Sequence, residues 1–256
     1  MVLEICVDSL ESAIVAAKGG AERIELCSDL MEGGITPSAG LIQAVRNAVA
    51  IDLFVMIRPR GGDSVYSIRE LEVMEKDIAV ARQLGANGVV LGVLRDDGRV
   101  DIRRTEQLVK LASPMQVTFH RAFDMTPDLE QACEDVIAAG AHRILTSGGK
   151  QTARKGGAQI ARLVKRAGTR IGVMAGSGIN ARNAVELARV TGAVEFHASL
   201  RKQVKNPVKY RKNDVSVGVR KSVDFIRFML AEADVRALRQ ALDSAVATAI
   251  AGHAVE

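Results

Sequence analysis

The chain has 256 residues, of which 48% are hydrophobic and 25% charged, and it carries a formal net charge of +5. This is a globular composition with room for one large barrel or two small domains. Apolar runs such as GVVLGVL at 88–94 are far shorter than the roughly 20 residues that span a bilayer, so a membrane protein is not expected. The opening MVLEICVD contains an acid where a signal peptide would be basic, so we expect a cytoplasmic protein. The number of cysteines is odd, which predicts reduced thiols rather than a disulfide framework.

The chain contains regularly spaced runs rich in Val, Ile, Leu and Phe, each followed by an amphipathic stretch of helical length, as in βαβ units. Two helix starts carry cap signals: Asp8 with Glu11 resembles a capping box, and Thr36-Pro37 resembles an N-cap and first helical residue. The strands are expected at 3–8, 23–28, 53–59, 88–94, 116–122, 143–148, 170–176 and 194–199. Eight units without a linker predict an α/β fold, a single (β/α)8 TIM barrel over residues 1–256, with a doubly wound open sheet as the alternative.

The positive charge gathers in one segment, residues 201–221, which holds eight Lys and Arg residues against the single acid Asp214. Such a segment permits anionic partners, including nucleic acids. However, aromatic residues make up only 3% of the chain and no nucleic-acid-binding motif accompanies the charge, so nucleic-acid binding is not expected. We interpret residues 200–222 as a solvated or oligomer-facing basic loop that precedes a terminal helix at 232–249.

The inward-facing residues of a barrel can be read from the apolar phase of each strand, because helices cover the outer face. On the fifth strand this phase places Thr118 and His120 inside and Arg121 outside, whereas the fourth and sixth strands are too apolar or too short to phase. On other strands the inward positions are Glu4, Cys6, Glu25, Cys27, Met56, Arg58, Glu195 and His197. Barrel interiors are normally aliphatic, so this polar set predicts a functional site at the carboxyl ends of the strands.

Charges buried in such an interior must pair, because an unpaired buried charge strongly destabilises a protein. We therefore expect Arg58 near Glu25 or Glu4, and His120 near an acid. The loops that follow the strands add a second group of candidates. Arg60 follows the third strand, and Ser177 and Gly178 lie in MAGSGIN after the seventh, where barrels often bind anions at a helix N-terminus; these three residues are our candidate anion site.

Several longer motifs occur in a fixed order: EICVDSLESAIVAAKGGAERIELCSDLMEGGITPS, FVMIRPRGGD, VTFHRAFDM, ILTSG and VEFHAS. Together they resemble the CutC copper homeostasis family from Leu3 to about Ser199. The resemblance implies a TIM barrel, a cytoplasmic setting, a homo-oligomer (dimer or tetramer) and copper(I) ligation by Cys6 and Cys27. A strand spacing of about 4.8 Å with an offset of about one residue predicts Cα atoms roughly 6 Å apart for this pair.

Two functions of different classes remain open, so the sequence does not decide whether the chain is an enzyme. The first is Cu(I) binding by the two thiolates, with His120 or His197 completing the site and Cys133 taking no part. The second is an enzyme that acts on a small phosphorylated or carboxylated metabolite. There Arg58 and Arg60 would hold the anion and His120 would be the general acid/base. Glu25 or Glu195 would orient His120 or share its proton.

Overall fold

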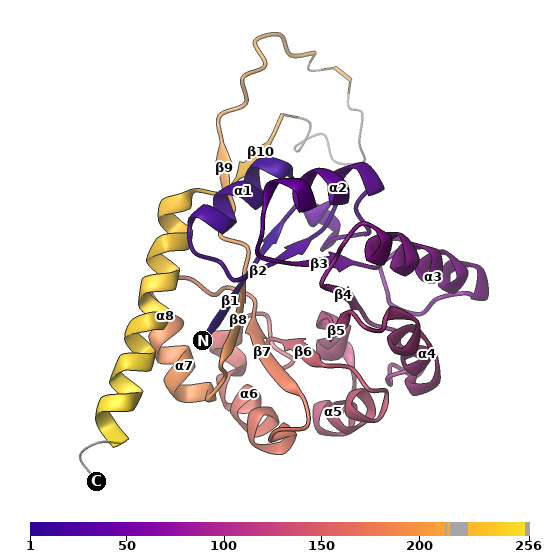
Figure 1. Ribbon diagram of the computed structural model, residues 1–256, viewed down its shortest axis with the longest axis vertical. Helices are drawn as coiled ribbons and strands as arrows, with labels where there is room; N and C mark the ends of the chain where they lie inside the picture. Colours follow the sequence, from indigo (N-terminus) through magenta and orange to yellow (C-terminus); the bar gives the residue numbers. More distant parts are fainter. Residues whose placement is uncertain (213, 216–224, 254–256) are drawn as a thin grey trace.

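Eight parallel strands close into a barrel surrounded by helices (Figure 1). The computed structural model describes residues 1–212, 214–215 and 225–253, without the side chains of 247–253. The strands pair in the order β1 to β8, and β1 pairs with β8 as well as with β2. Because the sheet has no open edge, the predicted TIM barrel is confirmed and the open-sheet alternative is wrong.

The barrel strands are short and lie within or beside the predicted runs. They are β1 (Val2–Val7), β2 (Arg23–Leu26), β3 (Asp52–Met56), β4 (Gly88–Leu91), β5 (Gln116–Phe119), β6 (Arg143–Thr146), β7 (Gly172–Gly176) and β8 (Glu195–Ala198). Several predicted strands extend further at their carboxyl ends, because residues such as Arg58 and His120 already belong to the loops. Those loops form the mouth of the barrel, where this fold carries its sites.

The helices alternate with the strands and cover the outside of the sheet. They are α1 (Leu10–Lys18), α2 (Ala39–Ala48), α3 (Ile68–Gln83), α4 (Ile102–Ala112), α5 (Leu129–Ala138), α6 (Ala153–Ala167), α7 (Ala184–Thr191) and α8 (Glu232–His253). Two short 3-10 turns, η1 (Leu30–Glu32) and η2 (Arg121–Met125), lie in loops at the mouth. Helix α8 packs against α7 and α1, and so lies beside the point where β8 meets β1.

Both predicted helix caps are displaced in the structure. Helix α1 is capped by Ser9, whose hydroxyl accepts a hydrogen bond from the backbone N–H of Ser12 at 3.2 Å. Asp8 instead pairs with Arg201 at 3.0 Å. Helix α2 is capped by Ser38 rather than by Thr36. In both cases a neighbouring serine takes the position from which a side-chain oxygen reaches the free N–H groups of the first turn.

Two separate apolar clusters form the core of the protein. The larger one lies between the sheet and the helices and contains the outward residues of every barrel strand. The smaller one lies inside the barrel and consists of Cys6, Cys27, Phe54, Met56 and Val90, with Leu30 against it. The small size of the inner cluster leaves room in the barrel interior for polar side chains.

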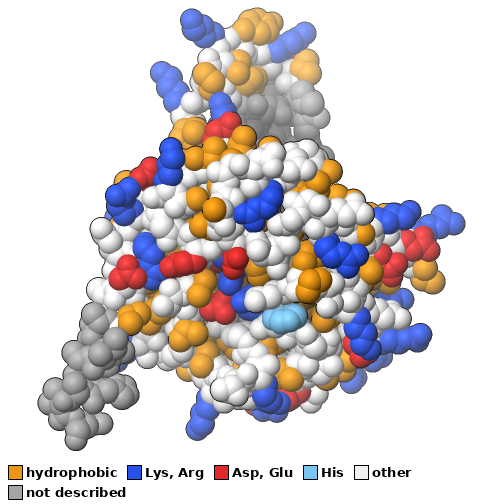
Figure 2. Space-filling view, viewed as in Figure 1, with side chains coloured by type: hydrophobic (Ala, Val, Ile, Leu, Met, Phe, Trp, Pro, Cys, Tyr) orange, Lys and Arg blue, Asp and Glu red, His pale blue; other side chains and the backbone are white. Residues whose placement is uncertain are grey.

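The predicted basic loop, residues 200–222, includes β9 (Lys202–Val204), which pairs antiparallel with β10 (Arg227–Met229) beyond the end of the loop. Residues 205–212 extend away from the barrel beyond β9 in Figure 1, and Figure 2 shows basic side chains spread over this projection. Residues 213 and 216–224 of this loop lie outside the description. Among the described residues, no helix is long and apolar enough to cross a membrane.

Candidate functional site

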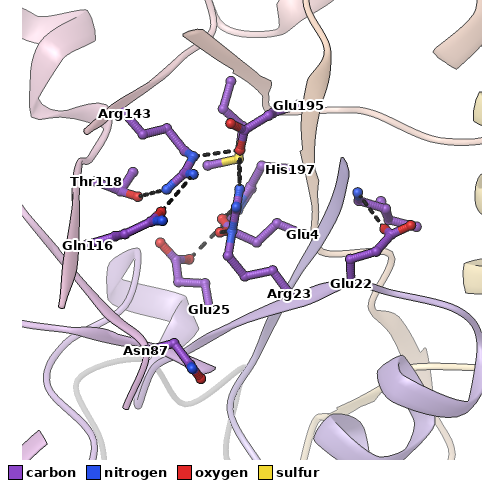
Figure 3. Close-up of polar contacts among 12 residues, drawn as sticks. Glu4, Glu22, Arg23, Glu25, Asn87, Gln116, Thr118, Arg143, Glu195 and His197 are labelled. Carbon is purple, nitrogen blue, oxygen red and sulfur yellow. Dashed lines mark hydrogen bonds and ion pairs between the residues drawn. The ribbon is translucent and has the colours of Figure 1, made fainter. Parts of the chain in front are cut away.

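Four charged side chains form an ion-paired layer inside the barrel, near the amino ends of the strands (Figure 3). Arg23 on β2 contacts both Glu4 on β1 and Glu195 on β8, and Arg143 on β6 contacts Glu195 at 2.5 Å. The ring of Phe54 lies 4.9 Å from the Arg23 guanidinium and 5.3 Å from that of Arg143. Two carboxylates and two guanidiniums therefore compensate each other around one aromatic ring.

The two arginines of this layer were missed by the sequence interpretation. Arg23 shares the inward phase of Glu25 and Cys27, so the alternation on its strand contained the signal. Arg143 begins the strand that could not be phased. It donates further hydrogen bonds to Thr118 at 3.3 Å and to Gln116 at 3.1 Å. Glu195 is therefore held among arginines, and the structure does not bring it to His120, which was one of two alternatives in the enzyme hypothesis.

A second layer above these ion pairs is organised by His197 on β8. Its Nδ1 lies 2.7 Å from Glu4 and its Nε2 lies 3.7 Å from Glu25. Burial alone would lower the pKa of His197, but the charge of Glu25 and hydrogen bonds to Cys6 and Glu4 raise it well above the usual value. His197 is therefore an imidazolium that lies between two buried acids, Glu4 and Glu25, although burial raises the pKa of Glu25. Burial also opposes ionisation of Glu4, yet Arg23 and His197 lower the pKa of Glu4 to about 2.

The two predicted copper ligands meet beside this imidazolium. The Sγ atoms of Cys6 and Cys27 are 3.8 Å apart, and both thiols are free and buried. Cys6 pairs in register with Glu25, so Cys27, just past the end of β2, lies two residues further along the chain rather than the one residue expected. The hydrogen bond to Cys27, together with burial, raises the pKa of Cys6. The hydrogen bond from Cys6 lowers the pKa of Cys27, but burial and Glu25 raise it to about 11.

His120, at the end of β5, faces the mouth of the barrel. Its Nδ1 accepts a hydrogen bond from the backbone N–H of Ala122 at 3.1 Å. Its Nε2 is buried and has no hydrogen-bond partner among the described residues. Burial and the charge of Arg58 lower the pKa of His120 to about 4, so the ring is neutral at pH 7. Neither ring nitrogen contacts an acid among the described residues, so the expectation that an acid accompanies His120 is wrong.

A cavity of about 660 Å³ opens above the two layers at the carboxyl ends of the strands. Its wall includes Cys6, Glu25, Met56, Arg58, His120, Leu145 and His197. Arg58 does not pair with Glu25 or Glu4 as predicted, because it lies beyond the end of β3, above the level of those carboxylates. Its guanidinium instead donates to the carbonyl oxygens of Glu32, Gly34 and Gly62 at 2.7–2.9 Å.

The residues of the predicted anion site lie apart. Arg60 is held by Glu70 at 2.6 Å and by Asp63 at 3.2 Å, and it does not line the cavity. Ser177 and Gly178 follow β7, which is four strands from β3 in the closed order and therefore on the opposite side of the barrel. The Ser177 hydroxyl donates to the carbonyl of Gln151 at 2.8 Å. The structure does not bring these three residues together.

Comparison with known proteins gives the same assignment as the motifs. The model of the CutC family matches residues 1–202. The CutC family protein of Chromobacterium violaceum is 50% identical over 244 residues, which are 95% of this chain and 99% of that protein. A copper homeostasis protein cutC homolog from Homo sapiens is 46% identical over 237 residues, with coverages of 93% and 86%. The chain belongs to the CutC family.

Solved structures support the CutC fold as well. The crystal structure of CutC from Streptococcus agalactiae matches with a TM-score of 0.74 and 34% identity, over 77% of this chain and 97% of that one. A thiamine phosphate pyrophosphorylase from Pyrococcus furiosus matches with a TM-score of 0.58 but 16% identity, over 95% and 96% of the two chains. The second likeness shows a shared barrel fold alone.

Two groups of side chains in this CutC chain have atoms close enough to share a metal ion, within the described residues. One is Cys6, Glu25 and Cys27; the other is Glu4, Glu25 and His197. In the second group, Arg23 already binds Glu4 and the imidazolium bridges both acids, so a cation there would meet two positive charges. The first group contains two thiols, and thiolates are the ligands that select soft ions such as Cu(I).

Proposed function

We propose that this CutC-family chain binds Cu(I) through the thiolates of Cys6 and Cys27 and serves copper homeostasis in the cytoplasm. The observation that carries the proposal is the 3.8 Å between the two buried Sγ atoms. Metal–thiolate bonds are about 2.3 Å long, so two sulfurs at this distance can contact one ion. The human relative is itself called a copper homeostasis protein cutC homolog.

The charges around the thiols favour a soft monovalent ion over a hard cation. Glu4, Glu25 and Glu195 face Arg23, Arg143 and His197, so three acids meet three cationic groups. Little carboxylate charge is left to attract Mg²⁺ or Ca²⁺, which prefer oxygen ligands. The thiols are protonated at neutral pH, because the pKa of each is raised. Binding of Cu(I) to both thiolates must therefore release two protons, and it leaves one negative charge in excess on the two sulfurs and the ion.

The cellular setting and the assembly belong to the same proposal. Reduced thiols persist in the cytoplasm, which supports a cytoplasmic location for a protein that uses them as ligands. A homo-oligomer, either a dimer or a tetramer, is proposed from the family resemblance. Sedimentation equilibrium of the purified chain with and without Cu(I) measures that assembly directly.

The test of copper binding is a Cu(I) competition titration under reductant with the wild type and three serine variants. Cys6→Ser and Cys27→Ser should each weaken binding by more than the roughly 100-fold that loss of an outer-shell partner costs. Cys133→Ser is the matched control, because Cys133 is equally buried but lies on α5, outside the barrel. Undiminished affinity in the first two variants, or a loss confined to Cys133→Ser, would rule out this site.

A further inference from the structure

We infer that the cavity at the mouth of the barrel binds the anionic oxygens of a small organic acid or phosphate ester. In this site the Nε2–H of His120 is a fixed hydrogen-bond donor and Arg58 supplies the attracting charge. The site lies beside the thiol pair but does not need copper. In this site His120 is a hydrogen-bond donor to the ligand, rather than the general acid/base that the sequence suggested.

The proton position on His120 follows from its backbone contact. The N–H of Ala122 can only donate, so Nδ1, which accepts it at 3.1 Å, must carry a lone pair. In a neutral imidazole the proton then resides on Nε2. This N–H is buried, with the residue only 6% exposed, and it has no partner among the described residues. A buried donor without a partner destabilises a fold, so its retention at a cavity wall points to a ligand oxygen.

The ring of His120 is also held in position before any ligand arrives. A Cβ atom on Gly92 would lie 2.6 Å from Nδ1 and Cε1 of the ring, so only glycine at this position allows the ring to lie against β4. The ring of Phe119 adds an edge contact with centroids 6.2 Å apart. A donor that is fixed in advance binds a ligand oxygen without losing conformational freedom.

Arg58 makes the cavity attractive to an anion. Its guanidinium is held by three backbone carbonyls and forms no ion pair with a described residue. The other arginines of the wall are compensated, since Arg95 pairs with Asp97 and Arg121 pairs with Asp124. The charge of Arg58 also acts at His120, where it contributes to the lowered pKa. Asp96 also lines the wall without an ion pair to a described residue, but the charge of Arg58 is the one that acts at the N–H donor of His120.

The remaining wall indicates a hydroxylated ligand of modest size. Oε1 of Glu25 is buried without a hydrogen-bond partner among the described residues, and it lines the same cavity. A ligand hydroxyl would satisfy it. Met56, Leu94 and Leu145 supply apolar contacts, and about 660 Å³ is within the usual range for small-molecule sites. The class is therefore a small hydroxylated carboxylate or phosphate ester.

The inference can be tested by NMR on the full chain labelled with ¹⁵N at its four histidines. Inorganic phosphate and glycolate are titrated separately at constant ionic strength with chloride. We expect the His120 signal to show the Nε2–H form at pH 7 and a saturable shift with at least one anion. A shift with phosphate alone would identify phosphate esters as the ligand class, and a shift with glycolate alone would identify carboxylates. Shifts with both would identify an oxyanion site that accepts either. No shift with either anion, or an Nδ1–H form, would overturn the inference.

Variants separate this site from the copper site. His120→Phe should weaken binding of the effective anion by about 10- to 100-fold, whereas His120→Gln, which retains an N–H donor, should lose much less. Arg58→Met should weaken it as well. Cys27→Ser should leave anion affinity unchanged, because Cys27 does not line the cavity. A loss of anion binding in Cys27→Ser equal to that in His120→Phe would contradict two separate sites.

Discussion

The ion-paired layer predicts a large stability loss when Arg23 is replaced by methionine. Arg23 is 4% exposed and contacts two carboxylates, so its removal leaves one buried negative charge in excess. Breaking a buried pair from one side costs about 3–5 kcal/mol. With an unfolding entropy of about 2.1 cal/mol/K per residue, this corresponds to a drop in Tm of roughly 6–9 °C.

The assay is thermal and urea unfolding of Arg23→Met beside a matched exposed control. Arg166→Met makes the same substitution at an exposed arginine that pairs with Glu130 and Glu134, and it should cost less than about 1 kcal/mol. The double variant Arg23→Met/Glu4→Gln removes one charge of each sign. It should be more stable than the sum of the single losses predicts.

Two results would refute this reasoning. If Arg23→Met is no less stable than Arg166→Met, burial does not make the ion pair costly to break. If the losses in the double variant simply add, Arg23 and Glu4 are not energetically coupled, despite their contact in the structure.

Three other predictions concern protons and the mouth loops. The pKa of Glu4 is lowered to about 2, so ionised Glu4 contributes about 3 kcal/mol to the free energy of unfolding. This contribution is complete above pH 4.5 and is lost as the pH falls toward 2. In urea unfolding, Glu4→Gln should therefore flatten the dependence of stability on pH between about pH 5 and 3. Because the pKa values of Cys6 and Cys27 are raised, Cu(I) affinity should rise by about one to two orders of magnitude per pH unit between pH 6 and 8; a flat titration would contradict thiolate binding. Asp124 accepts hydrogen bonds from the Ser147 N–H at 3.0 Å and hydroxyl at 2.9 Å, so Asp124→Ala should cost about 3 kcal/mol by calorimetry, and a loss under 1 kcal/mol would contradict this role.

The alternation along single strands predicted much of the interior correctly. Glu4, Glu25 and His197 contact one another, and Cys6 contacts Cys27, as inward phases require. The phase could not be read for β6, because its predicted run was too short to show an alternation. Arg143 was therefore missed. Arg23 was missed as well, although it lies on β2, whose inward phase was known. The role of Gly92 could not be predicted, because the sequence does not say that an imidazole from the next strand lies against it.

The sequence predicted the eight βα units and the inward side of the strands that could be phased, because these depend on local periodicity and on the burial of an apolar face. It favoured a closed barrel but left an open sheet as the alternative. The tertiary structure decided which inward side chains meet. The height of a side chain along the barrel axis depends on the offset between neighbouring strands and on how the sheet closes. Closure pairs β1 with β8 and so brings Glu4 to His197. The same geometry places Arg58 among loop carbonyls instead of carboxylates and leaves the Nε2 of His120 at the cavity without a partner among the described residues. The two-residue period of a strand specifies whether a side chain points into or out of the barrel. Which side chains from distant strands touch depends on their positions in three dimensions.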